Sequence, residues 1–296
     1  MHSEASIARR ARSGAAKVLP PGLTPLPWFP FPVATSASTT RAGARIAHRA
    51  ELAWTFLRGA LRRETDLALL VLDRDDWTRH AQTTDYGVPH IAQGVLVLGA
   101  EPPRAWHALS SHLAGKLAPD TLRDILAVHG PDGSTRGPAL AAVAEALIAR
   151  EVAHFVFVEQ GCTFPRPWIA EAFACYAAVA VLGETDPRGL RLLGSLADAA
   201  ATLDHDPCGR DARDAKCASA CSVATLLANL QLTRGAYFAY AQAHVEPLRR
   251  VLQLARHAAL PHNDRDLCVV LARRVHPSLC AIVHAACPIH DARAAA

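Results

Sequence analysis

Residues 146–157 read ALIAREVAHFVF, and this stretch decides how the rest of the chain is interpreted. It lies in a helix predicted over residues 138–159, which begins with proline at a position where helices favour it. At about 100° per residue, Arg150, Glu151 and His154 lie on or beside the apolar stripe that carries Leu147 and Val158. Three ionisable groups on a buried face are costly unless they pair or bind a metal ion. The stretch is therefore the first place to look for a site.

A second helix, predicted over residues 167–183, supplies another carboxylate. It opens with Pro167 and Trp168 and carries Glu171. The segment over residues 155–170 allows one more turn of the first helix, a loop and one turn of the second. Such a hairpin can bring the Glu171 carboxylate opposite His154. Two histidines and one glutamate are a known ligand set for catalytic zinc.

The two helices together, REVAH and PWIAEAFACY, resemble the gluzincin type of zinc metallopeptidase. In that family H-E-x-x-H is followed by W-[LI]-x-E-x-[FL]-A-x-Y. The residues that match are Glu151, His154, Trp168, Glu171, Phe173, Ala174 and Tyr176. The chain also looks like uncharacterised bacterial peptidase-like proteins that carry D-W…Y-G-x-P-H, here Asp76, Trp77, Tyr86, Gly87, Pro89 and His90. The resemblance extends over residues 65–180 or so and implies a zincin-like helical core.

The resemblance also implies roles for particular residues. His154 and Glu171 would be zinc ligands, and Glu151 would be the general base that takes a proton from zinc-bound water. Trp168 and Tyr176 are expected to be core or pocket-wall aromatics, and together with Phe173 they are the candidate pocket residues. The resemblance further implies that a tyrosine of the YFAY segment, Tyr237 or Tyr240, lies near the site.

Arg150 stands where the family has its first histidine ligand. A guanidinium does not deprotonate and cannot bind a metal ion. It would also repel a divalent ion at about 4 Å by roughly 8 kcal/mol at an effective dielectric of about 20. We therefore expect Arg150 to replace the metal and to pair with Glu171, with Glu151 as a second partner. This predicts a nitrogen–oxygen contact between Arg150 and Glu171 within about 4 Å.

Three hypotheses about function follow. The first is a degenerate metallopeptidase homologue without zinc and without peptidase activity, which binds a peptide or protein ligand. The second is an active zinc hydrolase that uses His154, Glu171 and a ligand recruited from elsewhere, with His90 as the first candidate. In the third the motif is a coincidence and the chain is a purely structural helical protein.

Composition narrows the class of protein. The chain has 296 residues, half of them hydrophobic, so it can bury a sizeable core. A net charge of +4 is too small to indicate nucleic-acid binding. No apolar run is long enough for a membrane span, and six prolines interrupt the apolar segment after the basic N-terminus. We expect a cytoplasmic protein; the oligomeric state stays open.

Other candidate groups have ordinary interpretations that we favour. All eight cysteines follow residue 160 and are interpreted as buried thiols. Cys175 is placed as a small buried residue in preference to a nucleophile. The loop with Cys208, Cys217 and Cys221 lacks the paired spacing of a zinc site. Three further residues, Asp204, His205 and Asp206, are interpreted as a solvated helix end.

The chain is predicted to be α+β, mostly α. A flexible leader over residues 1–40 precedes a single domain over residues 41–296, with a small sheet subdomain to about residue 130 and a helical subdomain after it. We expect a helix over residues 40–63 and strands over 66–73 and 94–100, joined by a loop. Helices are then expected over residues 104–116, 120–129, 138–159, 167–183, 188–203, 216–231, 235–258, 263–274 and 277–287.

Overall fold

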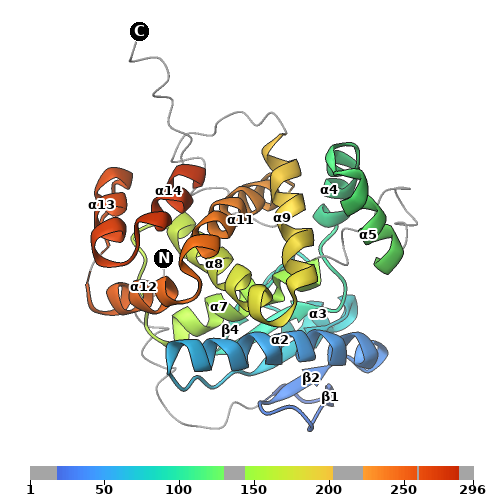
Figure 1. Cartoon of the computed structure of the whole chain (residues 1–296). Coiled ribbons are helices and arrows are strands. Elements are labelled where there is room, and N and C mark those ends of the chain that lie inside the picture. Colours follow the sequence, from blue (N-terminus) through green and yellow to red (C-terminus); the bar gives the residue numbers. More distant parts are fainter. Residues whose placement is uncertain (1–18, 130–143, 203–222, 259, 287–296) are drawn as a thin grey trace.

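The computed structural model describes residues 19–129, 144–202, 223–258 and 260–286. It confirms an α+β, mostly helical protein with one small N-terminal sheet (Figure 1). The helices are α2 (Thr40–Leu61), α3 (Arg74–His80), α4 (Ala105–Leu113), α5 (Pro119–His129), α7 (Ile148–Glu159), α8 (Pro167–Thr185), α9 (Pro187–Ala201), α11 (Val223–Ala243), α12 (Glu246–His257), α13 (Asp264–Arg274) and α14 (Cys280–Ala286). Short 3₁₀ turns are η1 (Ala37–Thr39), η2 (Ala114–Lys116), η3 (Ala144–Leu147) and η4 (Pro277–Leu279).

The sheet has five short strands in the order β1-β2-β3-β5-β4. They are β1 (Thr24–Pro25), β2 (Val33–Thr35), β3 (Leu69–Leu72), β4 (His90–Ala92) and β5 (Val95–Gly99). The three central strands are parallel, and β1 and β4 pair antiparallel at the two edges. β3 and β5 lie within the two strands that were predicted from short apolar runs. Such short, continuous apolar runs are typical of strands in a sheet that is buried on both faces.

Side chains alternate between the two faces of this sheet. One row packs with helices α2, α7 and α8 in the main core: Leu69, Val71, Leu96 and Leu98. The other row packs with Trp77 of α3 in a smaller cluster: Leu70, Leu72, Val95 and Val97. Figure 1 shows α2 and α7 beside the sheet, with the C-terminal helices gathered beyond them. A continuous main core thus joins sheet and helices, including Ile46, Leu96, Phe155 and Phe173.

The predicted flexible leader is wrong for residues 19–40. β1 and β2 lie within it, and Val33, Ala34 and Thr35 of β2 are buried. β2 pairs with β3, more than thirty residues further along the chain. The proline-rich composition of this segment gives no indication that it pairs with a strand so far along the chain. β1 tolerates its proline because it is an edge strand. Residues 1–18 lie outside the described part of the chain.

The predicted loop between the first two strands also needs correction. It contains α3 and β4. Asp73 caps α3 by accepting a hydrogen bond from the backbone N–H of Asp76 at 2.9 Å. This N-cap chemistry was visible in the sequence, but the helix is too short to show a periodic apolar face.

The predicted break between helices near residue 233 is wrong. α11 runs through Gly235 and ends at Ala243, and His244 adopts a left-handed φ of 52° before α12. Gly235 permits close packing: a Cβ there would lie 2.9 Å from the backbone oxygen of Ala281 in α14. Glycine at this position therefore serves a helix contact and does not end the helix.

α8 is apolar on all sides. Among the described residues, α8 is the one helix that is long and apolar enough to cross a membrane. Most of it is buried inside the protein, as is typical of the core helix of a globular domain.

Candidate functional site

The candidate site lies where α7 and α8 pack together. Arg150 and Glu151 are in the first turn of α7, and His154 is one turn further. Glu171 is in the second turn of α8, which begins with Pro167 at a favoured position. The buried neighbours on α7, such as Val152, fix the helix against the core and thereby fix these polar side chains.

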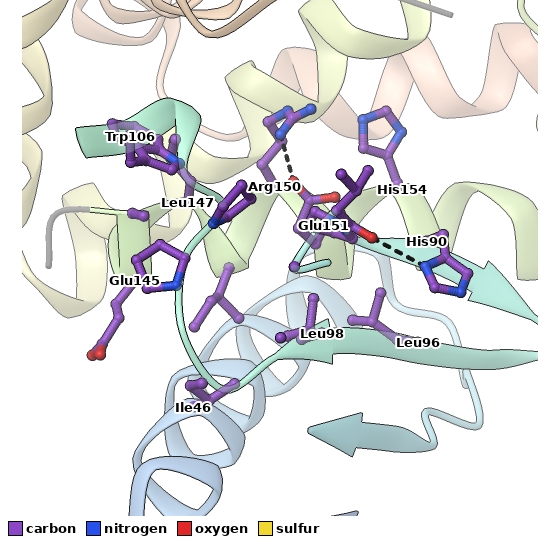
Figure 2. Close-up of a pocket in the computed structure, with 18 of the residues that line it drawn as sticks. Ile46, His90, Leu96, Leu98, Trp106, Glu145, Leu147, Arg150, Glu151 and His154 are labelled. Carbon is purple, nitrogen blue, oxygen red and sulfur yellow. Dashed lines mark hydrogen bonds and ion pairs between the residues drawn. The ribbon is translucent and has the colours of Figure 1, made fainter. Parts of the chain in front are cut away.

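Arg150 contacts both carboxylates of the cluster. Its Nε and Nη2 donate to the same oxygen of Glu171, Oε2, at 3.0 and 2.8 Å. Its Nη1 donates to Oε1 of Glu151 (Figure 2). The predicted contact between Arg150 and Glu171 is therefore confirmed. The geometry is not fork-to-fork, because two donors share one oxygen and leave Oε1 of Glu171 without a partner from Arg150.

His154 completes the cluster from the same helix. Its Nε2 lies 3.2 Å from Oε2 of Glu171, but Nε2 is buried and has no hydrogen-bond partner with acceptable geometry among the described residues. Glu151, His154 and Glu171 thus converge, as the hairpin prediction requires, and the guanidinium of Arg150 lies among them.

Burial and charge act in opposite directions on Arg150 and Glu171. The side chains of Arg150, Glu151 and Glu171 are 14%, 12% and 17% exposed. Burial opposes ionisation of Glu171, but attraction to Arg150 and His154 outweighs it and holds the pKa of Glu171 far below its usual range. Burial also opposes the charge on Arg150, but attraction to Glu151 and Glu171 raises its pKa above the usual value. The guanidinium and the Glu171 carboxylate therefore stay charged.

A cavity of about 390 Å³ borders the cluster. Arg150, Glu151, His154 and Glu171 all line it, and Figure 2 shows Leu96 and Leu98 on the opposite wall. Apolar side chains from the sheet, α2, α4, η3, α7 and α11 also line it, among them Ile46, Ile91, Trp106, Leu147, Ile148 and Leu226. The cavity is therefore mainly apolar, with the Arg150 cluster and two further carboxylates, Glu101 and Glu145, in its lining.

His90 lines the cavity but is not placed to complete a metal site. Its Nδ1 lies 3.0 Å from the carbonyl oxygen of Val88, and its Nε2 accepts a hydrogen bond from the backbone N–H of Gln82 at 3.3 Å. Both ring nitrogens are thus used by the backbone of its own loop, and the ring packs edge-on against Trp77. Residues 87–90 form one part of the cavity lining.

Several predicted site residues lie elsewhere. Trp168, Phe173 and Tyr176 are buried in the core, which confirms the core alternative for Trp168 and Tyr176, and none of the three lines the cavity, which corrects their placement as pocket residues. Tyr237 and Tyr240 also lie outside that wall; the hydroxyl of Tyr240 is 3.2 Å from Oε1 of Glu184. α8 and α11 have little amphipathic pattern, so the sequence does not show which of their faces meets the cavity.

Cys175 is a buried structural residue, as we favoured. Its Sγ lies 3.7 Å from the backbone oxygen of Asn229, and burial raises the pKa of the thiol to about 12. Such a thiol is not a nucleophile near neutral pH. The predictions for Asp204, His205, Asp206, Cys208, Cys217 and Cys221 lie outside the described residues.

Sequence reasoning missed Asn229 on α11. Asn229 lines the cavity and is only 5% exposed, and within the described part of the chain its Oδ1 has no hydrogen-bond partner. The signal was an asparagine inside the apolar run LLANLQL.

The cluster as it stands does not fit the zinc ion that the resemblance implies. Oε2 of Glu171 already accepts two hydrogen bonds from Arg150, and Arg150 holds the position of one histidine ligand. Within residues 19–129, 144–202, 223–258 and 260–286, no group of three His, Cys, Asp or Glu side chains is arranged to hold a metal ion.

The fold and the site together define a mostly helical α+β protein with an ion-paired cluster at an apolar cavity. No protein-family model, curated protein or solved structure matches the chain.

Proposed function

We propose that this chain is a degenerate homologue of gluzincin-type zinc metallopeptidases that binds a ligand in its cavity without hydrolysing it. The observation that carries this proposal is the position of the Arg150 guanidinium, which pairs with both Glu151 and Glu171. In this proposal a fixed organic cation replaces the metal ion and closes the same helix hairpin.

The electrostatics support a loss of metal rather than a weakened metal site. A divalent ion beside the guanidinium would meet a repulsion of up to roughly 8 kcal/mol, or about six decades in affinity. Zinc would also have to displace Arg150 from Glu171, and the depressed pKa of Glu171 reflects how strongly that pair is held. Arg150 also pairs, through Oε1 of Glu151, with the carboxylate that the resemblance names as the general base.

The test is the zinc content of the purified protein, compared with that of an Arg150→His variant. We expect negligible zinc in the wild type and about one equivalent in R150H, because the variant restores two histidines and one glutamate. Arg234→His is the matched control: Arg234 pairs with Asp198 on an exposed surface, and neither residue lines the cavity. Peptide hydrolysis is measured on all three proteins.

Stoichiometric zinc in the wild type, together with peptide hydrolysis, would replace this proposal by the zinc-hydrolase hypothesis. If R150H stays free of zinc although it folds like the wild type, the proposed descent from a metal site loses its support.

A further inference from the structure

The ion pairs of Arg150 leave two carboxylate oxygens unused. Arg150 engages Oε1 of Glu151 and Oε2 of Glu171. No hydrogen bond within the described part of the chain reaches Oε2 of Glu151 or Oε1 of Glu171, and neither atom is among the fully buried ones. Both residues line the cavity, so these two acceptors are open to its contents.

Asn229 adds an independent observation from another helix. Its backbone oxygen is satisfied, since it accepts from the hydroxyl of Thr233 at 2.8 Å, but its side-chain Oδ1 is buried without a partner. A buried acceptor that lacks a donor costs stability, and a ligand that brings a donor recovers part of it.

The residues that line the cavity include more carboxylates than cationic groups. Arg150 faces the two carboxylates of Glu151 and Glu171, which leaves one negative charge when His154 is neutral. The other two carboxylates at the cavity, Glu101 and Glu145, are paired outward with Arg74 at 3.8 Å and Arg45 at 2.6 Å. An anionic ligand would therefore meet open carboxylates, and three of the five N–H donors of Arg150 are already engaged by Glu151 and Glu171.

We propose that the cavity binds a small organic ammonium ion with an apolar body. The N–H donors of the amine would reach the open oxygens of Glu151 and Glu171, with the Asn229 amide as a further polar contact. The body would lie between Leu96 and Leu98 of β5 and the helical wall. The volume, about 390 Å³, is at the lower end of the range for small-molecule pockets. This inference rests on the proposed function, since it takes Arg150 to be the resident cation.

Two sources could supply this chemistry: a free hydrophobic amine, or the N-terminal residue of a peptide. The probes are phenethylamine, its neutral analogue phenethyl alcohol and its anionic analogue phenylacetate, each titrated calorimetrically into the full chain. A second set is phenylalanyl-leucine amide and its N-acetylated form. Tighter binding of the peptide amide than of phenethylamine, lost on acetylation, would identify a peptide N-terminus; the reverse order would identify a free amine.

We expect phenethylamine to bind at least about tenfold more tightly than phenethyl alcohol, and phenylacetate not to bind. Glu151→Gln keeps an acceptor for Arg150 and removes the open charge, so it should weaken amine binding about tenfold and leave the alcohol unchanged. The matched control is Glu246→Gln, on an exposed helix turn of α12 outside the cavity wall. The comparison of the three probes on the wild type needs no variant.

Equal binding of amine and alcohol, or preferential binding of phenylacetate, would overturn this inference. Zinc content is measured on the same preparation. A zinc-free protein that binds no amine refutes the ligand class alone, whereas zinc in the wild type refutes the proposed function as well.

Discussion

At the scale of single residues, Arg150 holds the site together, because it is the partner of two carboxylates that are mostly removed from water. A buried carboxylate without its partner is far less stable than one with it, whereas a pair replaced by apolar groups of similar volume is often neutral. Arg150 therefore stabilises the protein mainly by neutralising the buried carboxylates of Glu151 and Glu171.

We expect Arg150→Met to lower the free energy of unfolding by about 3–5 kcal/mol, because it leaves Glu151 and Glu171 mostly buried without their cation. The double variant Arg150→Met, Glu171→Met should recover the part of that loss that is due to Glu171. Chemical denaturation of both proteins and the wild type measures the difference. A single variant as stable as the wild type would contradict the idea that the pair closes the hairpin.

The same pair has a pH signature. The pKa of Glu171 is depressed in the folded protein, so its contribution to stability is present above its unfolded pKa, about 4.3, and is lost as the pH falls below that value. We expect the wild type to lose more stability than the double variant when denaturation is repeated at progressively lower pH. Parallel pH profiles of the two proteins would show that Glu171 is not the group responsible.

The sequence predicted residue positions correctly where they depend only on the spacing along one helix and on the length of one short loop. Arg150, Glu151, His154 and Glu171 converge because the helical repeat and the length of the hairpin leave few other arrangements. The open oxygens and the exclusion of His90 depend on side-chain and loop geometry that the sequence does not show.

At the scale of elements, α2, α8 and α9 lie close to their predicted bounds, and errors came where a distant contact decides the structure. β2 is three residues long and is fixed by β3, while α11 continues through Gly235 because α14 packs against it. In both cases a tertiary contact overrides the local signal.

We expect Gly235→Ala to destabilise the protein by about 1–3 kcal/mol, although alanine favours helix, because its Cβ would lie 2.8–3.0 Å from atoms of Ala281, Ile282 and Ala285. The control is Gly59→Ala in α2, where a Cβ meets nothing within 4 Å. That variant should be neutral or stabilise by up to about 1 kcal/mol. Thermal unfolding of both variants tests this prediction. Equal melting temperatures would show that the contact between α11 and α14 at Gly235 is not tight.

At the scale of the whole molecule, sheet and helices share one main core, so the N-terminal strands support the site although they are remote from it in sequence. β3, with all four residues buried, lies between β2 and β5. Without β2 it would become an exposed apolar edge, which favours aggregation.

We expect a chain that begins at residue 37 to be recovered mainly as aggregate, whereas one that begins at residue 19 keeps every contact described above and folds. Expression yield and size-exclusion chromatography of the two truncations measure this. A monodisperse, folded protein that lacks β1 and β2 would restore the hypothesis of a dispensable leader up to residue 40.

The width of the cavity is fixed by the hydrogen bonds and ion pairs that hold its two walls in place. Its sheet wall, β5, is paired with β3 at four positions and with β4 at three, so it moves only if a hydrogen-bonded ladder breaks. Its facing wall, α7, is clamped to α8 by Arg150 and Glu171. We expect walls fixed in this way to favour flat or unbranched guests of the proposed ammonium class over bulkier ones of the same charge.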